Sequence, residues 1–175
     1  MTPGLHVVAS ARAVGRDQPP PVPKFIVSDF APLVYAAVRR CIGAPESAHL
    51  LHGHGERAGL VLSSRRFDTV TLELSVEQAR QRRISPILFY QVLPTAILGQ
   101  VAIDYGMTGP VSCLASTGDA RAEALEVALL LLADDSADWM IAMTAGLADD
   151  PADSFATADL VRRAAPGDAR VPEAP

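Results

Sequence analysis

Two cysteines are the first residues of this sequence whose side chains could do chemistry. A thiolate is a common nucleophile in acyl transfer, and the chain offers Cys41 and Cys113. They do not form a Cys-x-x-Cys pair and stand in apolar or amphipathic surroundings, which favours reduced, buried thiols over a disulfide framework. A buried cysteine usually behaves as a small apolar side chain, so a nucleophilic Cys113 remains only an alternative.

Histidines form the second group with chemical potential. The segment HLLHGHGE contains His49, His52, His54 and Glu56. Imidazoles at short spacing can ligate zinc. No cysteine or aspartate completes a ligand set nearby and glycines flank the histidines, so an ordinary loop is favoured and no metal is assigned. Whether this loop binds anything stays open.

Arginines form a modest basic neighbourhood in a chain of net charge -5: Arg65, Arg66, Arg80, Arg82 and Arg83. Such a surface would attract an acidic acyl carrier protein or the phosphate of a phosphopantetheine group. A solvated helix end is the simpler explanation. The chain has no cluster of lysine and arginine with interleaved aromatic residues, which argues against a nucleic-acid partner.

The elements that must position these residues follow from hydrophobic patterning. We predict strands at Leu5 to Val14, Ala58 to Ser63, Val111 to Ala115 and Trp139 to Thr144, and helices at Asp29 to Arg40, Phe67 to Arg80, Val92 to Tyr105 and Asp119 to Ala133. The run AGLVLS indicates a strand buried on both faces. The order strand, helix, strand after Pro110 is a βαβ unit, which predicts an α/β fold with a parallel sheet covered by helices.

Length and composition predict one domain over residues 1–146, followed by an Ala/Asp/Pro-rich tail over residues 147–175. We expect this tail to be mobile, with only a short helical segment at Ser154 to Arg163. No apolar run reaches the roughly 20 residues that span a bilayer. The N-terminus also lacks the apolar block of a signal peptide, which predicts a cytoplasmic protein without a membrane partner.

One stretch of the sequence resembles a known family. Arg83-Ile84-Ser85-Pro86, the apolar helix to Tyr105-Gly106, then Gly109-Pro110 and ADWMIA at 137–142 occur in the order found in β-ketoacyl synthases of the thiolase superfamily. The resemblance covers about residues 57 to 146, with weaker support from Leu5 to Val14 as the opening strand. It implies half of a thiolase fold, an α/β fold with a mixed, mostly parallel sheet covered by helices.

The resemblance also implies where the nucleophile should stand. In that family the reactive cysteine lies eight residues after the proline of the Gly-Pro pair, which is Gly118 in this sequence. Glycine has no side chain and cannot form an acyl thioester. Ser116 and Asp119 have capping-box spacing, and the Asp119 carboxylate would repel a thiolate there. The family's catalytic histidines belong to a second half, and no histidine follows His54.

The function implied is that of a chain length factor, an inactive synthase homologue that pairs with a catalytic ketosynthase in type II polyketide or fatty-acid-like biosynthesis. No catalytic residue or cofactor is assigned. In this superfamily one strand crosses the dimer axis, and here it corresponds to Val111, Ser112, Cys113, Leu114 and Ala115. Phe67, Val70 and Leu74 are candidates for the interface or the acyl tunnel. The alternatives are a stand-alone homodimeric structural or acyl-binding module and a small acyltransferase using Cys113.

Overall fold

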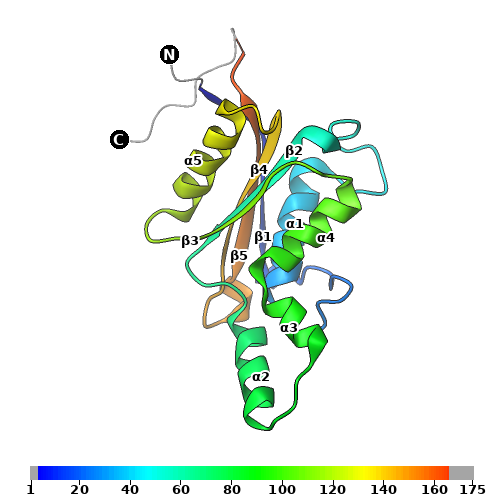
Figure 1. Ribbon diagram of the computed structural model, residues 1–175, viewed down its shortest axis with the longest axis vertical. Coiled ribbons are helices and arrows are strands. Elements are labelled where there is room, and N and C mark those ends of the chain that lie inside the picture. Colours follow the sequence, from blue (N-terminus) through cyan, green and yellow to red (C-terminus); the bar gives the residue numbers. More distant parts are fainter. Residues whose placement is uncertain (1–3, 166–175) are drawn as a thin grey trace.

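The computed structural model describes residues 4–165. Its centre is a five-stranded sheet (Figure 1). The strands are β1 (Leu5–Val14), β2 (Ala58–Ser64), β3 (Val111–Ala115), β4 (Trp139–Gly146) and β5 (Phe155–Arg163), in the order β1-β5-β4-β2-β3. β2 pairs in parallel with β3 and β4, whereas β5 pairs antiparallel with β4 and β1. Only β5 therefore runs against the others, and the predicted mixed, mostly parallel α/β sheet is confirmed.

Helices cover both faces of this sheet. They are α1 (Phe30–Ile42), α2 (Thr69–Arg80), α3 (Pro86–Val92), α4 (Pro94–Tyr105) and α5 (Ala120–Ala133), with short 3-10 segments at Gly15–Asp17, Gly55–Arg57 and Pro151–Asp153. α1 and α4 pack on one face and α5 on the other, while α2 and α3 extend past the sheet (Figure 1). The chain thus has two apolar layers separated by the sheet.

Strand β2 is the centre of the core, and all its residues are buried as the apolar run predicts. Side chains alternate between the faces of a strand. Leu60 and Leu62 join the layer under α1 and α4, and Val61 joins the layer under α5. The parallel neighbours of β2 supply the βαβ unit, since α5 carries the chain from β3 to β4.

The segment after Gly146 differs from our prediction. Ser154 to Arg163 is not helical, because Phe155–Arg163 forms β5 between β1 and β4. Its buried residues Ala156, Ala158 and Leu160 repeat every second position. Alanine is the best helix former, and this obscured the strand periodicity. The domain therefore includes β5, and the remaining tail, residues 166–175, lies outside the described residues.

The predicted helix Val92 to Tyr105 is also wrong in its extent. α3 ends at Val92 and α4 begins at Pro94, with an angle of 88° between the two helices. Proline has no N–H to donate and disfavours helical backbone in the residue before it, so Leu93 is extended. Among the described residues no single helix is long and apolar enough to cross a membrane, and only this bent pair passes that test together.

Candidate functional site

The turn between β3 and α5 holds the position where the family resemblance places a nucleophile. Gly118 directly precedes Asp119, the N-cap residue of α5. This turn follows the carboxyl end of a parallel strand, where α/β proteins usually place their binding and reactive groups. The backbone has the expected strand, turn and helix, and position 118 contributes no side chain to it.

Capping of α5 differs from the predicted box. The Asp119 carboxylate accepts hydrogen bonds from the N–H groups of Arg121 and Ala122, at 2.9 and 3.1 Å. Ser116 does not cap the helix, because its hydroxyl donates to the Gly118 carbonyl at 3.3 Å. The strand ends only at Ala115, so Ser116 comes too early in the turn to serve as the N-cap.

A second carboxylate, Glu123, reaches back from the first turn of α5 and was missed by the sequence analysis. Its Oε1 accepts hydrogen bonds from the N–H groups of Gly118, at 2.8 Å, and Thr117, at 3.2 Å. The nearby Ser116 hydroxyl, and then these backbone N–H groups, favour the charged carboxylate and so lower the pKa of Glu123. The only sequence signal is an acidic residue in the first helical turn, which the helix dipole favours in many helices without any functional role.

Arg65 holds the same turn from the other side. Its guanidinium donates to the Gly118 carbonyl at 3.0 and 3.3 Å. The predicted basic neighbourhood is therefore not uniform, since Arg80 instead pairs with Glu77 on its own helix, at 3.7 Å. The N–H and the C=O of Gly118 are both bonded, which fixes the turn.

Cys113 lies within β3 and not in the turn. Its side chain packs against the layer of α1 and α4, on the face of the sheet opposite α5. Burial raises the pKa of the Cys113 thiol to about 11, so the thiol is protonated at neutral pH. Cys41 is buried with a pKa likewise raised to about 11, and both cysteines are free. This environment is unfavourable for an acyltransferase that uses Cys113.

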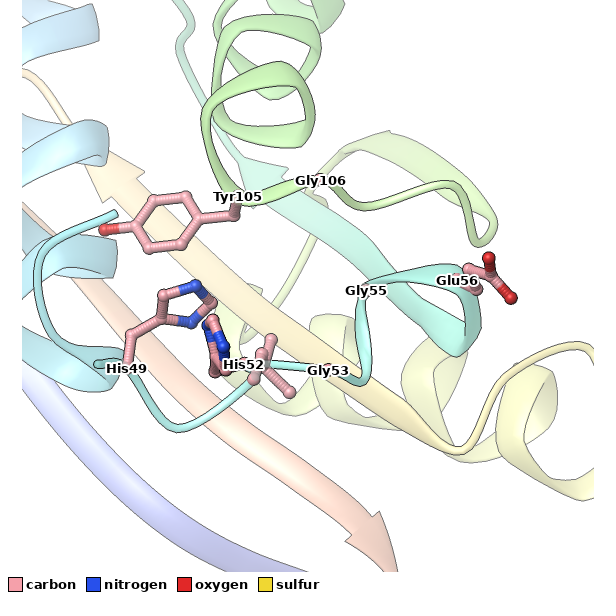
Figure 2. A pocket seen from close by; sticks show the side chains of 8 residues that line it. His49, His52, Gly53, Gly55, Glu56, Tyr105 and Gly106 are labelled. Atoms are coloured by element: carbon pink, nitrogen blue, oxygen red, sulfur yellow. The ribbon is translucent and has the colours of Figure 1, made fainter. Parts of the chain in front are cut away.

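The histidine segment is divided between two environments. His49 and His52 line a hollow of about 290 Å³, in which the His49 ring packs at 5.0 Å from the Tyr105 ring (Figure 2). Glu56 points away from both histidines in Figure 2, and His54 packs against Trp139, at 5.6 Å between ring centroids. Residues 4–165 contain no group of three or more His, Cys, Asp or Glu side chains that could hold a metal ion. This hollow adjoins the start of β2, whereas Gly118 follows the end of β3.

β3 forms one edge of the sheet, as the interface prediction requires. Successive residues of a strand direct their backbone groups to opposite neighbours. The Pro110 carbonyl accepts from Leu60, and the Ser116 N–H donates to Ser64, so even-numbered residues face β2. The N–H and C=O groups of Val111, Cys113 and Ala115 therefore face the open edge.

The three candidate tunnel residues do not share one environment. Phe67 precedes α2, packs partly buried against the core and makes an edge contact with Phe30, at 6.1 Å between ring centroids. Val70 and Leu74 lie on α2 and are 37% and 42% exposed. Phe67 is therefore a packing residue of this chain, and the exposed pair remains available to a partner.

Exposed apolar side chains are concentrated on α2, α3 and their connections: Val70, Leu72, Leu74, Val76, Ile84, Ile87, Phe89, Tyr90 and Leu93. α2 and α3 pack on each other, and both extend past the sheet (Figure 1). Clustered exposed apolar residues are typical of protein interfaces or ligand-binding grooves.

Comparisons with known proteins give structural matches only, since no family model and no curated protein matches the sequence. "The ishigamide ketosynthase/chain length factor" superposes with a TM-score of 0.74 at 13% identity, over 92% of this chain and 62% of the matched one. A ketosynthase (ApeO) in complex with its chain length factor (ApeC) from Xenorhabdus doucetiae gives 0.65 at 17% identity, over 93% and 80%. A 3-oxoacyl-(acyl-carrier-protein) synthase III gives 0.52 at 14% identity, over 96% and 52%.

These matches confirm the predicted fold. The chain has the α/β fold of ketosynthases and chain length factors, and it spans less than two thirds of the matched ishigamide chain. At such low identity the similarity concerns the fold alone.

Proposed function

We propose that this chain is a non-catalytic partner of a ketosynthase, with the role of a chain length factor. The observation that carries the proposal is Gly118, which occupies the turn before α5 in a ketosynthase fold and offers no nucleophile. The Xenorhabdus complex supports it, because it joins a ketosynthase to a chain length factor and 80% of its matched chain is covered by this one.

The open edge of β3 and the exposed apolar residues of α2 are the surfaces we assign to this partner. An edge of unpaired N–H and C=O groups is a template for another strand. An acyl carrier protein is a second partner in this proposal. One matched structure contains a "type II PKS acyl-carrier protein in complex with its ketosynthase", with a TM-score of 0.68 at 11% identity over 93% of this chain and 63% of that one.

Co-expression with a type II ketosynthase tests the assignment. We expect the two proteins to co-purify in equal amounts, and condensation to require the ketosynthase cysteine. The chain alone should not be acylated by an acyl thioester, because the only thiol near the site, Cys113, is half-buried with a raised pKa. Rapid, saturable acylation of Cys113 would instead support the acyltransferase. A stable homodimer that does not bind the ketosynthase would support the stand-alone module.

The variant Leu74→Glu should weaken the complex at least tenfold, or by about 1.4 kcal/mol, because a charge would replace an apolar side chain at the proposed interface. The isolated chain should keep its stability within about 0.5 kcal/mol, since Leu74 is 42% exposed. Leu50→Glu is the matched control, because Leu50 is 50% exposed on the loop between α1 and β2, away from α2. Binding is measured by titration calorimetry, and equal affinities of the two variants would contradict the role of α2.

A further inference from the structure

We propose that Glu123 is a built-in blocking residue, whose carboxylate occupies the anion-binding position of the α5 turn and keeps a thiol at position 118 unreactive. The inference rests on the proposed function, because it is that assignment that makes position 118 the place of a nucleophile. It adds that the site is inactivated twice, by the missing side chain and by the internal anion.

The first argument is the convergence of donors on one oxygen. The N–H groups of Thr117 and Gly118 both point to Glu123 Oε1, and the Ser63 hydroxyl contacts Oε2 at 3.4 Å. Successive backbone N–H groups that converge in a turn form an anion-binding concavity, and here the turn directly precedes the N-cap Asp119. Here the anion comes from the chain itself, so these two donors are not available to stabilise a thiolate or an oxyanion.

The second argument is distance. A Cβ atom built on Gly118 would lie 3.3 Å from Glu123 Oε1. That contact is tight, yet the carboxylate ends a flexible side chain and can yield by a few tenths of an ångström, so cysteine fits. A thiolate there would stand beside a carboxylate, and a neighbouring like charge disfavours the ionised form. The loss of the two N–H donors and the repulsion by the carboxylate both lower the fraction of this thiol that is ionised.

The other charges around the turn do not reverse this balance. Asp119 adds a second negative charge next to position 118. Arg65 lies close, although its guanidinium is directed to the Gly118 carbonyl, and Arg121 is bound by the buried Asp159. The carboxylate of Glu123 is therefore the group whose removal should change thiol reactivity most.

Alkylation of engineered thiols by iodoacetamide tests the proposal on the isolated full chain. The thiolate displaces iodide from the reagent, so the rate follows the thiolate fraction. We compare Gly118→Cys alone with the same variant carrying Glu123→Gln, which removes the charge and keeps the shape. Glu126→Gln is the matched control, because Glu126 is an exposed carboxylate further along α5. Tandem mass spectrometry assigns the label to a residue, because Cys113 and position 118 share the tryptic peptide that ends at Arg121, whereas Cys41 lies on another peptide.

We expect Glu123→Gln to lower the pKa of the new thiol by about one unit and to raise its alkylation rate at pH 7 about threefold, because the weaker nucleophilicity of a less basic thiolate offsets part of the gain in thiolate fraction. Glu126→Gln should cause no comparable change. Rates within twofold for all three proteins would overturn the proposal. Amide exchange gives an independent measurement: Glu123→Ala in the otherwise native chain should accelerate exchange at Thr117 and Gly118. Unchanged exchange there would also overturn it. Neither measurement involves a ketosynthase, so a failure here is distinct from a failure to form the complex.

Discussion

Arg121→Ala should lower the free energy of unfolding by about 2–3 kcal/mol, a large loss for a side chain that reaches the surface. The Asp159 side chain is 2% exposed and accepts from Arg121 at 2.7 and 2.9 Å, with Ser10 as a further donor. Without the guanidinium, a buried carboxylate would keep only part of its hydrogen bonds. The expected loss is below that of a fully buried pair, because the Arg121 side chain is 54% exposed and water screens it.

Urea denaturation followed by circular dichroism measures this effect, and Arg16→Ala is the matched control. Arg16 bonds Asp153 at 2.6 Å, yet the two side chains are 66% and 60% exposed. An exposed pair contributes little, so the control should change stability by about 0.5 kcal/mol or less. Similar losses for both variants would show that the burial of Asp159 does not govern the effect. A smaller loss for Arg121→Ala would show that Ser10 and water suffice for Asp159.

This ion pair also illustrates what the sequence could not reveal. The helix that carries Arg121 was predicted from its own pattern, as was the central strand β2 from its apolar run. Asp159, in contrast, lies in a segment where alanines hide the strand period, so the prediction was a short helix in a mobile tail. Its partner is 38 positions away in the chain, and only the insertion of β5 between β1 and β4 brings the two together.

The candidate site shows the same division between local pattern and long-range contact. The turn at Gly118 and the edge strand β3 could be predicted because the family resemblance gives their order along the chain. The hydrogen bonds between Glu123 and the turn could not be predicted. A glutamate in the first turn of a helix is common, and residue spacing does not reveal the direction of its side chain. Phe67 was predicted to lie on the apolar face of a helix that spans Phe67 to Arg80, although the helix begins only at Thr69 and the ring packs on the core.

Cys113→Pro should weaken association with a ketosynthase at least tenfold while the isolated chain stays folded. The Cys113 N–H faces the open edge of β3, because the neighbouring even-numbered residues make the bonds to β2. Proline at this position removes a donor that a partner strand would use, and edge strands tolerate proline where the N–H faces outward. We expect β3 to pair antiparallel with the corresponding strand of the partner. The hydrogen bond lost in Cys113→Pro would therefore be one of those that join the two strands.

Two variants of the same strand make this prediction specific. Cys113→Ala removes the thiol and keeps the N–H, so it should still associate. Leu114→Pro removes an N–H directed to β2 and should destabilise the isolated chain itself. Light scattering with and without the ketosynthase gives the assembly state, and thermal melts report on the fold. We expect at least a tenfold weaker complex for Cys113→Pro, or about 1.4 kcal/mol. If that variant binds as tightly as Cys113→Ala, the open edge of β3 is not the interface, and the exposed apolar residues of α2 and α3 become the surface to test next.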